Sequence, residues 1–188
     1  MDDKIKNRTL TAEEIDVRVA QAKDNGVSLL LYKNARVDMD ILDELFGTFN
    51  WKRELIDGGK GCAVSIWDSE KAQWISKEDV GSESNVEAEK GQASDSFKRA
   101  CVNFGIGREL YSAPFIWVSA DKLKKLMPSG RKDKNGKLIY ACYDKFIVGK
   151  IEYDENRKIK NLAIMANGAL AFVNMKENEG KESEAKAG

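Results

Sequence analysis

Lys98 and Arg99 are the residues of this sequence whose type and position best suit a binding site. They lie in a predicted helix whose apolar side chains recur at helical spacing, namely Phe97, Ala100, Cys101 and Phe104. The two cations fall off this apolar stripe, and the helix before them is rich in small residues that permit close approach. Either another chain segment or a phosphate backbone fits such a surface. Asp95 allows a third interpretation, an exposed ion-pair trio of little energetic weight.

Groups that could support covalent catalysis are scarce. The sequence has 0 histidines, which removes histidine bases and histidine-ligated metals. It also lacks the phosphate-binding P-loop pattern, and the glycines at 58–61 read as a hairpin turn. Gly105-Ile106-Gly107 follows a helix and lacks the third glycine of a dinucleotide fingerprint. Glu78-Asp79 is the one carboxylate pair that suggests a metal-dependent nuclease.

Composition indicates a globular protein of one domain. The chain has 188 residues, of which 42% are hydrophobic and 33% charged. We expect a single domain over residues 1–175 and a disordered charged tail over 176–188. The 3 cysteines, Cys62, Cys101 and Cys142, are scattered and odd in number, which is typical of a reducing compartment. With no signal core and no apolar run of membrane-spanning length, the sequence predicts a cytoplasmic protein without membrane contact.

Charge is segregated along the chain although it sums to zero. Residues 121–137 carry seven positive against two negative side chains, a surplus of five. Residues 68–89 carry seven negative against two positive side chains, the opposite surplus. Such segments are either solvated faces, a surface for an anionic polymer, or complementary surfaces of two copies of the chain.

The elements that must position the cationic pair are three strands and one helix. Alternating side chains and turn residues predict strands at 51–56, 62–67 and 73–80, followed by a helix over about 86–104 that opens with the capping box Ser84-x-x-Glu87. Strands and helices do not alternate regularly, so the pattern favours an α+β fold over a doubly wound sheet.

The flanking elements are predicted from caps and apolar spacing. Helices are expected from the capping box Thr11-x-x-Glu14 through residue 22, from an Asp38 cap to Gly47, and from Ser119 to Pro128. Strands are expected at 27–32, 114–118, 140–153 (broken) and 159–164, with a basic loop at 129–137 between two of them.

Around the cationic pair the sequence resembles a known family. Glu78-Asp79-Val80-Gly81, Glu89-Lys90 and Asp95-x-Phe97-Lys98-Arg99-Ala100-x-x-x-Phe104-Gly105 look like the core of the Rad52/Rad22 family of single-strand annealing proteins, and its phage and prophage branch is the most similar. Residues 32–51, with Arg36, Phe46-Gly47 and Asn50-Trp51, are similar to the region that precedes this core. The resemblance spans about residues 10–118.

This resemblance implies a β-β-β-α core, in which an antiparallel sheet packs on a long helix, and assembly into rings. It also implies that single-stranded DNA is bound in a basic groove and that complementary strands anneal in recombination and repair without ATP or another cofactor. Lys98 and Arg99 match the family's DNA-contacting pair, Lys90 matches a further basic position, and Arg36 matches more loosely. Val102 stands where the family has another basic residue, so one phosphate contact is absent or moved. A phage exonuclease or a host single-strand-binding protein is the kind of partner that the resemblance leaves open.

Annealing chemistry agrees with the scarcity of catalytic groups, because no covalent bond changes. Lys and Arg grip phosphates regardless of sequence and leave base edges free to pair. We therefore interpret the four tryptophans, Trp51, Trp67, Trp74 and Trp117, mainly as core or subunit-contact residues, since stacking platforms would compete with pairing. Basic side chains outside the core are expected to add a second DNA surface, namely Lys124, Lys125, Arg131 and Lys132. The rival hypotheses are a single-stranded DNA binder that does not anneal, the nuclease that uses Glu78 and Asp79, and a structural assembly protein.

Overall fold

A computed structural model describes residues 8–82 and 88–175 of the chain, without the side chains of 88–90. Its internal contacts divide the chain into two compact units. Unit 1 comprises Met1–Asp16 and Leu31–Ala113, and unit 2 comprises Val17–Leu30 and Pro114–Gly188. That residues 1–175 act as one annealing domain stays a prediction, and the tail expected to be disordered lies outside the described residues.

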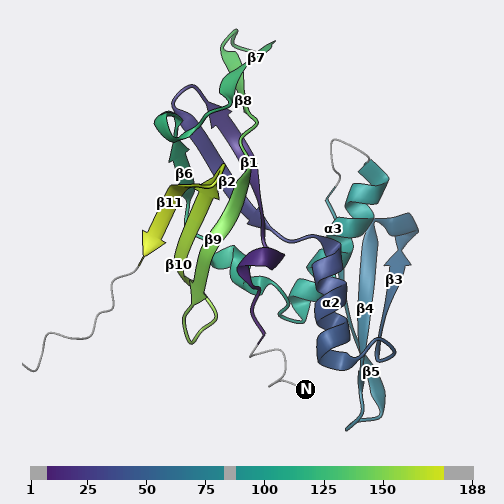
Figure 1. Ribbon diagram of the computed structural model, residues 1–188. Coiled ribbons are helices and arrows are strands. Elements are labelled where there is room, and N and C mark those ends of the chain that lie inside the picture. Colours follow the sequence, from purple (N-terminus) through teal and green to yellow (C-terminus); the bar gives the residue numbers. More distant parts are fainter. Residues whose placement is uncertain (1–7, 83–87, 176–188) are drawn as a thin grey trace, which may run out of the picture. The chain divides into compact units, whose positions relative to one another are not determined.

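Unit 1 contains a three-stranded antiparallel sheet in the order β3-β4-β5 (Figure 1). The strands are β3 (Trp51–Ile56), β4 (Gly61–Asp68) and β5 (Gln73–Val80), which confirms the three predicted strands. Arg53 pairs with Val64, and Val64 pairs with Lys77, so these three side chains share one face. The sequence alternates cleanly in β4, where Cys62, Val64 and Ile66 are fully buried.

The helix after this sheet, α3 (Ala88–Asn103), contacts β4 and β5. Its predicted apolar stripe is confirmed, because Phe97, Ala100 and Cys101 are fully buried and Phe104 is nearly so. Lys77 extends over the Phe104 ring, with Nζ 4.8 Å from its centroid, and donates to the Asn103 carbonyl at 2.8 Å. The α+β class with antiparallel sheets is thereby confirmed, whereas ring formation stays a prediction.

The helix α2 (Ala35–Phe46) also packs against α3. It begins one turn earlier than predicted, because Asn34 rather than Asp38 is the N-cap and accepts from the amides of Arg36 and Val37. Asp38 is instead buried completely. Gly47 ends the helix as predicted, with a φ of +83° that favours glycine. Short 3-10 turns complete the unit: η1 (Ala12–Glu14), η2 (Asp57–Gly59) and η3 (Arg108–Ser112).

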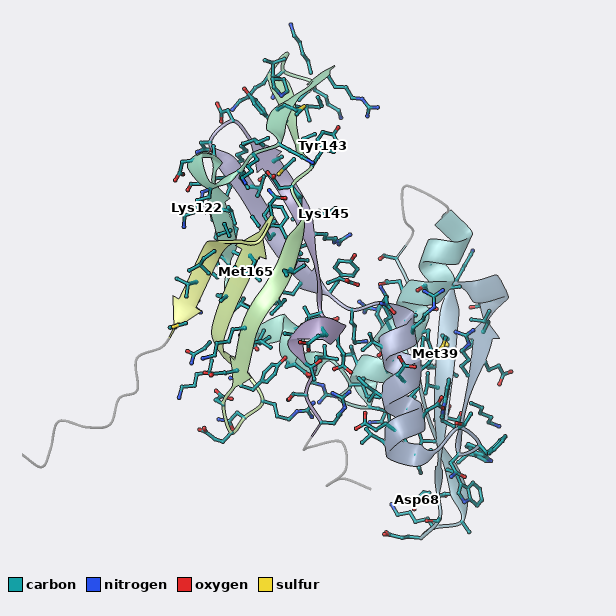
Figure 2. The ribbon with its side chains drawn as sticks, in the orientation of Figure 1. Met39, Asp68, Lys122, Tyr143, Lys145 and Met165 are labelled. Carbon is teal, nitrogen blue, oxygen red and sulfur yellow. The ribbon has the colours of Figure 1, made fainter. Side chains whose placement is uncertain are left out.

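Unit 2 is built on a six-stranded sheet in the order β11-β10-β9-β1-β2-β6. Its strands are β1 (Asp16–Lys23), β2 (Gly26–Tyr32), β6 (Ile116–Ser119), β9 (Phe146–Tyr153), β10 (Ile159–Ala166) and β11 (Ala169–Met175). The two outer strands, β6 and β11, contact one another, so the sheet curls toward closure. The Lys122 ammonium, labelled in Figure 2, donates to the Ala171 carbonyl of β11 at 3.0 Å.

A separate two-stranded ribbon belongs to the same unit (Figure 1). It is formed by β7 (Leu126–Lys132) and β8 (Leu138–Cys142). The predicted helix from Ser119 to Pro128 is therefore wrong beyond one turn, η4 (Ala120–Lys122), and part of the predicted loop at 129–137 is strand. Pro128 is tolerated there because a two-stranded ribbon has only edge strands, in which a missing amide donor can face solvent.

The predicted helix over residues 11–22 is also wrong. The capping box exists, since the Thr11 amide donates to Glu14 at 2.8 Å, but it closes only the single turn η1. The chain then forms β1, in which Val17 and Val19 alternate with polar residues and favour a strand. β11 was not predicted, and the capping box at Ser84 and Glu87 lies outside the described residues.

Candidate nucleic-acid interface

Arg99 lies at the contact between α3 and β5. Its Nε is 3.2 Å from Oδ1 of Asp79, and the two side chains are 46% and 23% exposed. The hydrogen bond to Asp79 raises the pKa of Arg99 further above its usual value. Arg99 is therefore charged at every accessible pH, fixed at one end by a single carboxylate and open to solvent over about half its surface.

Lys98 lies one residue away and so about 100° around the helix. Its side chain is half-buried and makes no hydrogen bond or ion pair within the described part of the chain. Its positive charge favours the ionised form of Asp38, the buried carboxyl on α2. Arg99 is thus paired with β5, whereas Lys98 lies on another side of α3 and acts on Asp38 only through its charge.

Asp95 does not form the ion-pair trio that the sequence allowed. Its Oδ2 accepts from the Ser82 amide at 3.0 Å and from the Ser82 hydroxyl at 3.1 Å. At Gly81, just before Ser82, an added Cβ would lie 2.2 Å from the carbonyl oxygen of Gln92. The small residues of α3 therefore accommodate a chain segment, the one that leaves β5, and Asp95 fixes that segment.

A buried ion pair lies beside Lys98. Lys33 Nζ donates to Oδ1 of Asp38, and the two side chains are 4% and 0% exposed. Burial raises the pKa of Asp38 to about 6, although Lys33 opposes this shift. Burial also raises the pKa of the neighbouring Cys101 thiol strongly, so this cysteine is not a nucleophile. Sequence reasoning missed the pair, because Lys33 carries no pattern that separates it from a surface lysine.

The structure defines fewer contacts for the other two predicted DNA-binding residues of unit 1, Arg36 and Lys90. Arg36 is exposed in the first turn of α2. Lys90 lies in the first turn of α3, and its side chain is outside the described ones. Among the described residues, no hydrogen bond or ion pair brings Arg36 together with Lys98 or Arg99, so its DNA role stays a prediction.

Three further basic side chains were not selected from the sequence: two lie on strand β3 and the third caps α3. The Arg53 guanidinium is 5.2 Å from the Phe97 ring centroid, and Lys52 Nζ is 4.7 Å from the Trp74 centroid on the opposite face. Arg108 donates to the Val102 carbonyl at 2.9 Å and so caps α3. Strand alternation in β3 could have placed Arg53 and Lys52 on opposite faces, but it does not reveal their aromatic partners.

The tryptophans of unit 1 differ in role. Trp51 packs against Phe97, with ring centroids 6.2 Å apart, and donates from Nε1 to Asp43 at 2.6 Å, as a core residue would. Trp67 and Trp74 form an edge-to-face pair at 5.4 Å, and Trp74 is 41% exposed. The contacts of Trp51 agree with a core role, whereas a subunit-contact role for the exposed Trp74 stays a prediction.

Of the carboxylate pair in the nuclease hypothesis, Asp79 is occupied by protein groups. Asp79 Oδ1 accepts from the Val80 amide at 2.8 Å and from Arg99, and Oδ2 lies 3.4 Å from the Asn103 amide nitrogen. No cluster of three or more His, Cys, Asp or Glu side chains suited to a metal ion occurs in the described ranges.

The basic residues of unit 2 are all exposed: Lys124, Lys125, Arg131 and Lys132. The amides of Lys124 and Lys125 both donate to Oδ2 of Asp144 at 3.0 Å, which leaves their side chains outside. Burial opposes the charge of Asp144, but these two amides and Asn167 outweigh it and lower its pKa. Arg131 and Lys132 belong to β7 of the ribbon. The structure thus gathers these four residues in unit 2 and the other four predicted contacts in unit 1.

Comparison with known proteins finds a family match over about a third of the chain. A family model described as "Rad52/22 family double-strand break repair protein" matches residues 62–126, which run from β4 to the start of β7 and include Lys98 and Arg99. The resemblance to the Rad52/Rad22 family predicted from the sequence is confirmed over this segment. The phage branch stays a prediction.

Two relatives carry the same name, "Single-stranded DNA-binding protein DdrA". The protein from Deinococcus radiodurans is 31% identical over 100 residues, which cover 52% of this chain and 47% of the relative. The protein from Deinococcus deserti is 43% identical over 53 residues, which cover 27% of this chain and 26% of the relative. The aligned segments thus span less than half of either relative. Neither described helix has both the length and the apolar character that crossing a membrane requires.

Proposed function

We propose that this protein binds single-stranded DNA and anneals complementary strands without ATP, as part of recombination and repair. The proposal rests on one observation: the two adjacent cations on α3 are only weakly paired with acidic side chains. Lys98 makes no ion pair within the described chain, and Arg99 is held by one carboxylate with about half of its side chain exposed. Both lie in the segment that matches the Rad52/22 family.

The physical argument is that phosphate contacts are independent of sequence. A strand held through its phosphates presents its bases to a second strand, whereas a strand held through stacked bases does not. Annealing changes no covalent bond, so we also propose that the protein is not an enzyme. Arg36 and Lys90 are included in the proposed unit 1 surface on the family resemblance alone.

Assembly into a ring is the second part of the proposal. A subunit that supplies only two to four phosphate contacts binds weakly by itself, and a ring multiplies those contacts along one strand. The opposed charge of residues 68–89 and 121–137 supports association between copies. Protein partners and the cytoplasmic location expected from the sequence stay predictions.

Binding without annealing is the second candidate, and the name of the two Deinococcus relatives favours it. The two functions differ in one assay. Fluorescent complementary oligonucleotides are mixed with and without the protein, and pairing is followed in time. Acceleration of pairing supports annealing, and protection of single strands without acceleration supports the second candidate.

The DNA contact itself is tested by the double variant Lys98→Ala/Arg99→Ala. We expect the affinity for an unstructured oligonucleotide to fall about tenfold or more, for all base compositions alike. The slope of log affinity against log salt should flatten by about 0.7 per lost contact. The matched control is Lys60→Ala/Lys71→Ala, which removes the same charge from exposed lysines of the same unit. Equal loss in both variants would reduce the proposal to a net-charge effect, and a folded Lys98→Ala/Arg99→Ala protein with unchanged binding would refute it.

A further inference from the structure

Asp38 is a buried carboxylate of which only one oxygen is used. Its side chain is fully buried on α2, and its Oδ1 accepts from Lys33. Its Oδ2 has no hydrogen-bond partner in the described structure. A buried, unsatisfied carboxylate oxygen is costly, so a role beyond packing is expected of it.

Lys33 cannot move to satisfy both oxygens. Its side chain is 4% exposed, and the backbone at Gly107 packs directly on it. A Cβ added at Gly107 would lie 2.1 Å from Lys33 Cε, so the glycine is required by the position of this lysine. The buried pair is therefore a fixed feature, and Oδ2 is left to a group other than Lys33. Two such groups on α3, the Cys101 thiol and Lys98, favour the ionised carboxylate.

Of these two groups, Lys98 is the cation. It attracts the ionised form of Asp38 across the contact between α2 and α3, and it makes no ion pair of its own within the described residues. The four-carbon stem of a half-buried lysine lets its ammonium group move by several ångströms while the stem stays packed. Lys98 can thus be drawn toward Asp38 or extended toward solvent.

We propose that Asp38 is a positioning residue for Lys98: its unpaired oxygen draws the Lys98 ammonium to the α2 side of α3 in the free protein, and a DNA phosphate must compete with it. The inference rests on the proposed function, in which Lys98 contacts phosphate. It assigns to Asp38 the control of how readily that contact forms.

The titratable and charged groups around Asp38 set the pH range in which it is ionised and can attract Lys98. Lys33 precedes α2, whereas Lys98 and the Cys101 thiol come from α3. On the β3 side, Arg53 lies over Phe97, and Trp51 bonds to Asp43. Burial raises the pKa of Asp38 to about 6, so mildly acidic solution neutralises it and releases Lys98.

The test is the affinity for an unstructured oligothymidylate, measured by fluorescence anisotropy for wild type and Asp38→Asn. At about pH 8 we expect Asp38→Asn to bind two- to fivefold more tightly, roughly the effect of removing one competing charge. Asp40→Asn is the matched control, because it makes the same charge change at an exposed position of the same helix. Wild-type affinity should also rise more steeply than that of Asp38→Asn between about pH 8 and about pH 5.

The decisive comparison repeats Asp38→Asn in the Lys98→Ala background. We expect the gain to disappear there, since it acts through Lys98. A gain that persists without Lys98, or that Asp40→Asn reproduces, overturns the inference and leaves the proposed function intact. Unchanged binding by Lys98→Ala alone overturns the proposed phosphate contact and this inference with it.

Folding of the variants is monitored by thermal melting. Because Asp38→Asn leaves Lys33 buried without a carboxylate, the pair Lys33→Gln/Asp38→Asn provides a neutral replacement that retains an amide hydrogen bond. It should show the same gain in affinity as Asp38→Asn. A folded Lys33→Gln/Asp38→Asn protein with wild-type affinity and wild-type pH dependence would also overturn the inference.

Discussion

Arg99 of α3 and Asp79 of β5 form an ion pair in which Nε and Oδ1 are 3.2 Å apart. The pair joins the helix to the strand that precedes it, and it leaves the remaining guanidinium nitrogens of Arg99 available. The same arginine therefore ties the helix to the sheet and presents a cation to solvent. A phosphate that binds Arg99 must share it with Asp79, because a guanidinium can bond to more than one oxygen acceptor.

Asp79→Asn should strengthen DNA binding. The substitution keeps the shape of the side chain and removes the negative charge beside Arg99, so a phosphate meets less competition. We expect a two- to fivefold gain in affinity at low salt that shrinks as salt rises, with a loss of stability of about 1 kcal/mol or less for this partly exposed pair. Glu70→Gln removes the same charge at an exposed turn of the same unit. A gain of equal size in Glu70→Gln would show that Asp79 has no special relation to Arg99.

The core around this pair could be predicted from the sequence, because it is encoded locally. Alternation in residues 62–67 and the helical spacing of Phe97 and Phe104 each specify one buried face, and the structure confirms both. Two turn-rich connections between the three strands favour neighbouring antiparallel pairing, which is what the sheet has.

Features that depend on residues far apart in the chain were not predictable. Asp38 has the residue type of a helix cap, and only packing against α3 makes it a buried partner of Lys33. The capping box at Thr11 specified one turn correctly, but the tertiary pairing of Val17 and Val19 within a sheet decided what followed. Asp95 lies at ion-pair spacing from Arg99, yet its carboxylate accepts a hydrogen bond from Ser82 instead.

Gly81→Ala should destabilise unit 1. The new Cβ would lie 2.2 Å from the Gln92 carbonyl oxygen and 2.8 Å from the Ser96 amide nitrogen, both backbone atoms of α3 that cannot rotate away. We expect a loss of about 1–3 kcal/mol in the free energy of unfolding, measured by denaturant titration. Gly61→Ala is the control, since its nearest neighbours lie at 3.5 Å or beyond. If Gly81→Ala and Gly61→Ala unfold alike, the close approach of this segment to α3 is incorrect.

The buried pair of Lys33 and Asp38 should make stability depend on pH. The pKa of Asp38 is raised from 3.8 to about 6, so the folded state binds its proton more tightly than the unfolded state does. The resulting contribution is fully present below about pH 4 and is lost as pH rises through about 6. It amounts to about 3 kcal/mol at most. The apolar replacement Lys33→Met/Asp38→Leu should abolish this component at little cost in stability at pH 7.

Chemical denaturation of wild type and Lys33→Met/Asp38→Leu across pH 4 to 7 measures that component directly, as the difference between the two profiles. Carboxylates whose pKa is lowered by folding, such as Glu14 and Asp144, contribute the opposite slope to both proteins and cancel in the difference. A difference profile that is flat from about pH 4 to 7 would contradict the burial of an ionisable Asp38.

The basic residues of unit 2 should affect annealing more than binding. Lys124, Lys125, Arg131 and Lys132 are exposed and make no ion pair among the described residues, so they can attract a second strand without holding the first. Replacing all four with alanine should slow annealing of complementary oligonucleotides about tenfold at low salt, with a smaller loss in affinity for a single strand. Four exposed lysines of the same unit, Lys23, Lys145, Lys150 and Lys158, form the charge-matched control. An unchanged annealing rate in the first variant, or an equal loss in the control, would exclude a second DNA surface at these residues.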